Sequence, residues 1–213
     1  MSNQVIASAK TLFSAYREAL TGLEAGLGLD FSKTVDLIKA STGHVVVCGM
    51  GKSGIIGRKI SATLASTGTP SLFLHPAEAI HGDLGMVRRG DIVLLISYSG
   101  STEEIVRLLP AFKRLDARLI AMTGNPSSMI ATSAEISLDI SVDREACPLN
   151  LAPTTSSLNS LVLGDAIAVA LMEARGFQES DFANTHPGGT LGRRLLTRVR
   201  DKMRSENLPF VDA

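Results

Sequence analysis

A run of small hydroxyl residues follows an apolar segment near the middle of the chain. The segment 91–96 leads directly into Ser97-Tyr98-Ser99-Gly100-Ser101-Thr102, and apolar residues then recur at helical spacing. The run is therefore expected where a strand ends and a helix begins. A helix N-terminus offers unpaired amides and partial positive charge, and this run adds hydroxyl donors and a glycine that lets a ligand approach the backbone. The pattern predicts a phosphate-ester site, with a Ser/Thr helix cap as the alternative.

A second glycine-rich turn, Gly49-Met50-Gly51-Lys52-Ser53-Gly54, follows the apolar segment 45–48. It matches the dinucleotide fingerprint, but that motif expects an acidic residue about 20 positions later, where this chain has Leu74-His75-Pro76. It also imitates the end of a P-loop, whose first glycine would fall at Val46. Both nucleotide interpretations fail. What remains is a glycine-rich turn with one lysine, whose side chain would either contact a ligand or lie in solvent.

Strand and helix patterns alternate through the middle of the chain. Strands are expected over 45–48, 71–74, 92–96, 118–122 and 136–140, and helices over 57–66, 102–115 and 127–133. Such alternation predicts an α/β fold with a doubly wound, mostly parallel, five-stranded sheet flanked by helices. Ligands of such sheets bind beyond the carboxyl ends of the strands, where both glycine-containing turns would lie.

The two ends of the chain carry further helical patterns. Residues 1–42 are expected to form an N-terminal helical hairpin that serves association, with a stripe of apolar residues from Val5 to Leu23 and a second helix over 34–40. After the loop 143–153, a long apolar helix is expected to be buried and to end at Arg175-Gly176. An Arg-rich helical piece should end near Met203. Residues 43–203 would form the main domain, and 204–213 a tail or a shortened linker.

The composition limits the class of protein. The chain has 213 residues, 45% of them apolar, a formal net charge of zero and no basic block, which argues against nucleic acid or an anionic membrane surface as main partner. Its start lacks a signal-peptide pattern, and no stretch approaches the ~20 apolar residues of a membrane span. Two distant cysteines favour reduced thiols. These features predict a cytoplasmic protein.

Five blocks together carry a family resemblance. They are Gly49 to Gly54, His75-Pro76-Ala77-Glu78-Ala79-Ile80-His81-Gly82-Asp83-Leu84-Gly85, Ser97-Tyr98-Ser99-Gly100, Glu145-Ala146-Cys147-Pro148-Leu149 and His186-Pro187-Gly188-Gly189-Thr190-Leu191-Gly192. In order and spacing, from about residue 44 to 203, the chain resembles the sugar isomerase (SIS) domain of bacterial D-arabinose 5-phosphate isomerases. Ser-x-Ser-Gly by itself indicates only the wider SIS superfamily. The Glu-Ala-Cys-Pro and His-Pro-Gly-Gly blocks narrow the resemblance to the arabinose 5-phosphate isomerase family.

The resemblance implies interconversion of D-ribulose 5-phosphate and D-arabinose 5-phosphate through an enediol, which supplies the Kdo sugar of lipopolysaccharide. It also implies a homotetramer and no organic cofactor. Two departures stand out. Most such isomerases continue into a pair of CBS domains, and this chain stops shortly after Met203, where the first would begin. Tyr98 stands where asparagine is common.

The resemblance implies four catalytic residues: Lys52, Glu104, Glu145 and His186. We interpret Glu145 as the enediol acid/base, His186 as a proton shuttle in its own or a neighbouring subunit, and Lys52 as the positive charge. Glu104 would position hydroxyls or share the proton transfer. The alternatives are structural: Glu104 as one of a first-turn acidic pair, Glu145 as a solvated loop charge, and His186 as a packing residue.

The predicted substrate-binding residues are Gly51, Ser53, Gly68, Thr69, His81, Ser97, Ser99, Gly100 and Thr102. His75 resembles a position that binds zinc in relatives, and because zinc normally takes about four ligands, any zinc would borrow the others and inhibit. Two rival functions remain. One is another isomerase of the superfamily, such as a phosphoheptose isomerase, and the other is a non-catalytic regulator that binds a sugar phosphate.

Overall fold

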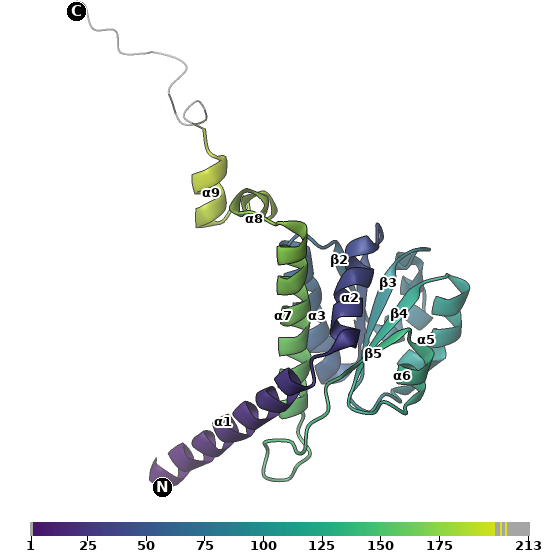
Figure 1. Cartoon of the computed structure of the whole chain (residues 1–213), viewed down its shortest axis with the longest axis vertical. Coiled ribbons are helices and arrows are strands. Elements are labelled where there is room, and N and C mark those ends of the chain that lie inside the picture. The colour runs from purple at the N-terminus through teal and green to yellow at the C-terminus, as the bar shows by residue number, and fades with distance from the viewer. Residues whose placement is uncertain (1, 199–200, 202, 204–213) are drawn as a thin grey trace, which may run out of the picture.

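The computed structural model describes residues 2–198, 201 and 203 (Figure 1). Its helices are α1 (Ser2–Ala25), α2 (Leu29–Ala40), α3 (Gly51–Ser66), α4 (Pro76–Ile80), η1, a 3-10 helix (Asp83–Met86), α5 (Glu103–Arg114), α6 (Met129–Ser133), α7 (Thr155–Arg175), α8 (Glu179–Thr185) and α9 (Thr190–Leu196). Its strands are β1 (Val45–Gly49), β2 (Ser71–Leu74), β3 (Ile92–Ile96), β4 (Arg118–Thr123) and β5 (Ile136–Asp139).

In the described residues, five strands form one parallel sheet in the order β2-β1-β3-β4-β5. Strands β1 and β3 are buried along their whole length, as expected for strands covered on both faces. This confirms the predicted fold class. The strand order reverses between β1 and β3, and the crevice beyond their carboxyl ends is the usual ligand site of such a sheet. The two glycine-containing turns begin at those two strand ends.

Helices cover both faces of the sheet (Figure 1). The hydrophobic residues of α2, α3 and α7 pack on one face, and those of α4, α5 and α6 pack on the other. Alternate residues of each central strand enter each core, since Val45 and Val47 belong to the first and Val46 and Cys48 to the second. The strand ends, and the turns that follow them, are therefore held from both sides.

Some element boundaries differ from the sequence prediction. Helix α3 begins at Gly51, which adopts a φ of 57°, instead of at residue 57. Its first turn is polar and lacks the apolar periodicity that marks a helix. The short helix α4 was not predicted, and α9 ends at Leu196, before Met203. The predicted tail 204–213 lies outside the described residues.

Helix α7 forms the spine of one face. It contacts α1, α2 and α3. By length and composition it could span a membrane, with a mean hydropathy of 1.4 over 18 residues, which corrects the expectation that no segment qualifies. Half of that window is buried, and buried core helices of globular proteins pass the same test. Its position against the sheet agrees with the predicted burial.

The two N-terminal helices both contact α7. Figure 1 shows α1 extending away from the body toward the N-terminus. Its apolar stripe is divided accordingly: Leu23 packs against the core, whereas Val5 and Phe13 are 70% and 58% exposed. The outer half of α1 thus presents apolar side chains to solvent.

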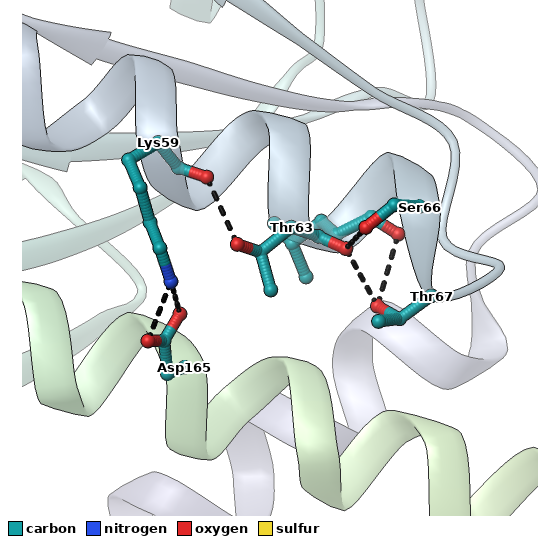
Figure 2. A network of polar contacts seen from close by, with 6 residues as sticks. Lys59, Thr63, Ser66, Thr67 and Asp165 are labelled. Atoms are coloured by element: carbon teal, nitrogen blue, oxygen red, sulfur yellow. Dashed lines mark hydrogen bonds and ion pairs between the residues drawn. The ribbon is translucent and has the colours of Figure 1, made fainter. Parts of the chain in front are cut away.

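Helix α7 lies close to α3. A Cβ at Gly164 would come within 2.5 Å of two Ile60 atoms, so only glycine allows this separation. One residue further on, Asp165 accepts a hydrogen bond of 2.6 Å from Lys59 of α3 (Figure 2). On the same side of α3, Thr63 donates to the carbonyl of Lys59. This seam fixes the axis of α7, and thereby the start of the helix to which the loop 143–153 leads.

Candidate functional site

A cavity of about 420 Å³ lies beyond the carboxyl ends of the strands. It is lined by Met50, Lys52, Ser53, Ile56, Ser97, Tyr98, Ser99, Thr102, Glu145, Asn150, Leu151, Pro153, Ser156, Ser157 and Ser160. Six of the predicted site residues meet here: Lys52, Ser53, Ser97, Ser99, Thr102 and Glu145. The cavity is therefore our candidate site. A larger cavity, of about 880 Å³, lies among α5, α6 and the start of β4 and is lined by none of the predicted site residues.

The turn after β3 supplies hydroxyl and amide donors to the cavity. The hydroxyls of Ser97 and Thr102 lie 2.8 Å apart, and Ser97 Oγ also accepts from the amide of Gly100 at 3.1 Å. Among the described residues, Thr102 makes no side-chain cap hydrogen bond to α5. The helix-cap alternative for this run therefore fails for Thr102. The start of α5 faces the cavity with hydroxyl groups and uncapped amides, which suits an anion.

Two features of the structure require glycine at position 100. Its φ of 66° lies in the left-handed region, and a Cβ would come within 1.9 Å of Ser128 Oγ. Ser128 is the N-cap of α6, and its hydroxyl accepts a hydrogen bond from Ala131. The turn thus packs directly against the start of α6, and this contact restricts its backbone conformation. Gly100 shapes the site without lining the cavity.

The turn after β1 brings Lys52 and Ser53 to the wall of the same cavity. Gly51 takes a φ of 57°, and a Cβ at Gly54 would come within 2.6 Å of the carbonyl oxygen of Gly49. The glycines of this turn therefore permit a tight strand-to-helix transition. Lys52 lies in the first turn of α3 and is exposed, so its ammonium group can reach a ligand in the cavity.

Glu145 is held by a dense set of donors. Its carboxylate accepts five hydrogen bonds: from the amide and hydroxyl of Thr154, the hydroxyl of Thr155, and the amide and hydroxyl of Ser156. Partial burial acts to raise the pKa of Glu145, but the hydrogen bonds from Ser156, Thr154 and Thr155 outweigh it and lower that pKa below its usual value. Glu145 is thus no solvated loop charge, and it is ionised at neutral pH.

The loop around Glu145 is held together by hydrogen bonds between its own residues. The amide of Glu145 donates to Asn150 Oδ1 at 2.7 Å, and the Sγ of Cys147 accepts from the amides of Leu151 and Ala152 at 3.1 Å each. These two amides, with others of the loop, lower the pKa of the Cys147 thiol. Asn150 adopts a φ of 53°, which asparagine tolerates better than most residues. The loop therefore presents Glu145 in a defined place.

Tyr98 forms part of the cavity wall within the turn 97–102 after β3, which we call the phosphate turn after its predicted role. Its hydroxyl lies 3.3 Å from both the carbonyl oxygen and the amide nitrogen of Val142, donating to the first and accepting from the second. Its ring lies over Gly124, where a Cβ would come within 2.7 Å of a ring carbon. The residue thus contacts the chain segments that follow β4 and β5.

Glu104 lies in the first turn of α5, is half-buried, and does not line the cavity. Its neighbour Glu103 forms an ion pair with Arg107 one turn along the helix, as expected for a first-turn acidic residue. Only two residues separate Glu104 from Ser101 and the phosphate turn. A role in the site stays a prediction.

His186 lies at the other end of α7. Its ring stacks on Phe182, with centroids 3.9 Å apart, and its Nδ1 lies 3.1 Å from the carbonyl oxygen of Phe182. Figure 1 shows α8 and α9 at one end of α7 and the loop that carries Glu145 at the other. The 21 residues of α7 span about 32 Å. The structure therefore does not bring His186 to Glu145 within one chain.

Gly68 and Thr69 lie at the same end of α7 as His186, where Thr185 donates a hydrogen bond to the carbonyl of Ser66. They precede β2 and so belong to the amino-end edge of the sheet, a strand length away from the cavity. A Cβ at Gly68 would come within 2.7 Å of the Phe177 ring, and Thr69 Oγ1 accepts a hydrogen bond of 2.6 Å from Arg175. Within one chain these contacts are structural, and substrate binding by the two residues stays a prediction.

The histidines near α4 also lie outside the cavity lining. His81 is exposed at the end of α4, and the Nδ1 of His75 is buried without a hydrogen-bond partner among the described residues. Among all the residues that the structure describes, no group of three or more His, Cys, Asp or Glu side chains is placed to hold a metal. A zinc at His75 would need ligands from elsewhere.

Sequence reasoning missed several residues of the cavity. Ser156, Ser157 and Ser160 line it from the first two turns of α7, and Asn150 lines it from the loop. The signal was the Thr-Thr-Ser-Ser run at the start of a long apolar helix, because hydroxyl residues there supply donors to an anion. In the structure, Thr154, Thr155 and Ser156 of this run donate to Glu145.

Comparison with known proteins identifies relatives. The model of the SIS domain family matches residues 37–170. The arabinose 5-phosphate isomerase KdsD of Pseudomonas aeruginosa is 60% identical over 97% of this chain and 64% of its own length. The arabinose 5-phosphate isomerase GutQ of Escherichia coli K12 is 52% identical over 94% of this chain and 62% of its own. This chain thus spans less than two thirds of these curated relatives.

Among solved structures, E. coli CFT073 c3406 in complex with arabinose 5-phosphate is 43% identical, with a TM-score of 0.85, over 88% of this chain and all of that one. The strand order of the sheet and the phosphate turn after β3 are both consistent with the match to the SIS domain family. Because the family model covers well over half of the sequence, this chain belongs to the SIS domain family.

Proposed function

We propose that this chain is an aldose-ketose isomerase that interconverts D-ribulose 5-phosphate and D-arabinose 5-phosphate through an enediol. The observation that carries the proposal is the cavity in which an uncapped helix start with hydroxyl donors faces an ionised carboxylate and a lysine. Two relatives named arabinose 5-phosphate isomerase and a similar structure in complex with that sugar phosphate support the choice of substrate.

In the proposed reaction, the phosphate binds to the turn after β3. Ser97, Ser99 and Thr102 supply hydroxyl donors, and the first amides of α5 supply the rest. The Ser97–Thr102 hydrogen bond would open so that both hydroxyls turn to the phosphate oxygens. The sugar chain then extends across the cavity toward the loop that carries Glu145.

Glu145 would act as the base that moves a proton between C1 and C2. Its lowered pKa keeps it ionised before the reaction, as a base must be, and its donors hold its oxygens in one place. Lys52, which also lines the cavity, would stabilise the negative charge that develops on the enediolate oxygen. Glu104 would orient substrate hydroxyls from the start of α5.

His186 would serve the site of a neighbouring subunit in a homotetramer. Two observations support this part of the proposal: α7 separates His186 from the Glu145 of its own chain, and the outer half of α1 exposes apolar side chains such as Val5 and Phe13. Gly68 and Thr69 lie at the same end of α7 as His186 and would approach the same neighbouring site. We further propose a cytoplasmic enzyme that supplies Kdo synthesis.

The direct test is to add ribulose 5-phosphate and follow the products by NMR. We expect arabinose 5-phosphate to appear, with exchange of one carbon-bound proton for solvent deuterium. The variant E145Q should fold and lose nearly all turnover, whereas E103Q, an exposed charge on α5, should keep it. Turnover of sedoheptulose 7-phosphate alone would favour the phosphoheptose isomerase. A thermal shift with arabinose 5-phosphate without turnover would favour the regulator.

The placement of His186 has its own test. The variants E145Q and H186A are mixed, unfolded and refolded together, and compared with each variant refolded alone. If sites are shared between subunits, the mixture should regain activity, because some sites combine an intact Glu145 with an intact His186. A mixture as inactive as the separate variants would contradict shared sites.

A further inference from the structure

Tyr98 reaches across the carboxyl ends of three neighbouring strands. Its backbone follows β3, and its carbonyl oxygen accepts hydrogen bonds from the amide of Gly124 at 3.0 Å and from Thr123 Oγ1 at 3.2 Å, both at the end of β4. Its ring covers Gly124, and its hydroxyl contacts Val142, beyond the end of β5. Because neighbouring strands lie about 4.8 Å apart, this side chain spans roughly the distance from β3 to β5.

Both ends of this contact lead to functional groups of the cavity. Tyr98 is flanked by Ser97 and Ser99 of the phosphate turn, and Val142 lies three residues before Glu145. The hydroxyl meets both backbone polar atoms of Val142, so it fixes the direction of the chain as well as its position. Among the described residues, Tyr98 is the cavity-lining side chain that joins these two segments.

We propose that Tyr98 is a positioning residue that sets the distance between the phosphate turn and the carboxylate of Glu145. The inference rests on the proposed isomerase function. In a sugar phosphate, the reacting carbons lie a fixed number of bonds from the phosphate, so this distance decides which carbon meets the base. A misplacement of about 1 Å can cost on the order of 100-fold in rate, even when the contacts to the substrate are intact.

The hydroxyl is the group to remove. In Y98F the ring still covers Gly124, the phosphate donors stay, and only the contacts to Val142 are lost. We expect kcat to fall about 3- to 10-fold, since two long hydrogen bonds are lost, while KM for ribulose 5-phosphate changes less than about twofold. The matched control is Y16F, because Tyr16 is the other tyrosine and lies on α1, outside the cavity lining.

A second measurement does not depend on turnover. Cys147 lies two residues beyond Glu145 in the loop that Tyr98 would brace, and the other cysteine, Cys48, is buried. The rate of Cys147 alkylation therefore reports on the order of this loop. We expect this rate to change at least about threefold in Y98F, through exposure and loss of the amide contacts to sulfur, and to be unchanged in Y16F.

The outcomes separate the two proposals. If wild-type protein does not turn over ribulose 5-phosphate, the proposed function fails, and the alkylation rates still decide whether Tyr98 braces the loop. If Y98F keeps the wild-type kcat and alkylation rate, the positioning role is wrong. If kcat and KM change together with a lower melting temperature, Tyr98 has a general structural role, which also contradicts the inference.

Discussion

Ser156 donates both its amide and its hydroxyl to the carboxylate of Glu145. Because Ser156 is the second residue of α7, the proposed base also satisfies donors at the start of the helix that packs along the sheet. Among the described residues, Thr154 provides no side-chain cap of its own. The negative charge of Glu145 complements the positive end of the helix dipole. The proposed catalysis and the stability of α7 thus depend on the same ionised group.

Replacing Glu145 by glutamine should make stability less dependent on pH. The folded-state pKa of Glu145 is lowered, so its stabilisation is complete above the unfolded pKa of about 4.3 and is lost as pH falls through the folded value. Urea unfolding should therefore show E145Q less stable than wild type at pH 7. The difference should shrink below about pH 4. A difference that stays constant from pH 7 to pH 3 would contradict the account.

The two thiols should differ sharply in reactivity. Burial raises the pKa of Cys48 to about 12, whereas amide donors from Ala152 and Leu151 lower the pKa of Cys147. The thiolate is the reactive form, so iodoacetamide at pH 7 should modify Cys147 and leave Cys48 intact until the protein unfolds. Peptide mapping by mass spectrometry measures both rates, and C147S provides the blank. Equal labelling of both thiols in native protein would refute this prediction.

Much of the fold was predictable because its signals are local. Apolar strands alternated with amphipathic helices, and β1 and β3 each ended in a turn with glycine and hydroxyl residues. The parallel sheet then places the turns after β1 and β3 at one edge, which is why Lys52 and Ser97 meet in one cavity. Glu145 joins them because the end of β5 and the start of α7 lie at that same edge.

What local signals cannot give is the outcome of long-range packing. The sequence could not show that α7 carries His186 away from Glu145, since that depends on how α7 lies along the sheet. Nor could it show that Gly68 and Thr69 contact Phe177 and Arg175. The early start of α3 was missed because its first turn is polar, although the conformation of Gly51 defines it.

Gly100→Ala should damage the phosphate turn. Alanine would meet Ser128 and would also have to hold a φ of 66°, so we expect a loss of about 2 kcal/mol or more in stability and a large loss of turnover. Gly90→Ala is the matched control: its φ of 87° imposes a similar backbone cost, and a Cβ there meets nothing within 4 Å in the described structure. Thermal unfolding of both variants isolates the contact with Ser128. An equal loss of stability in the two variants would contradict a specific role for the contact between Gly100 and Ser128.

Turnover should survive removal of divalent metal ions. The proposed proton transfer uses groups already present, with Glu145 as base and Lys52 near the developing charge. We therefore expect EDTA to leave kcat unchanged, and added zinc to inhibit wild type more than H75A. Loss of activity in EDTA that a metal restores would overturn this view, and equal inhibition of H75A would remove the predicted role of His75.

The seam between α3 and α7 offers a contrast between packing and charge. Gly164→Ala would push a methyl group into Ile60, and because that contact lies in the core, we expect a loss of about 1–3 kcal/mol. Asp165→Asn breaks the ion pair with Lys59, but both side chains are more than a third exposed, so the loss should stay below about 1 kcal/mol. Urea unfolding compares the two variants. Since the axis of α7 positions the loop of Glu145, G164A should also lower kcat, whereas D165N should keep it. A larger loss of stability in D165N than in G164A would show that charge, rather than close packing, holds α7 in place.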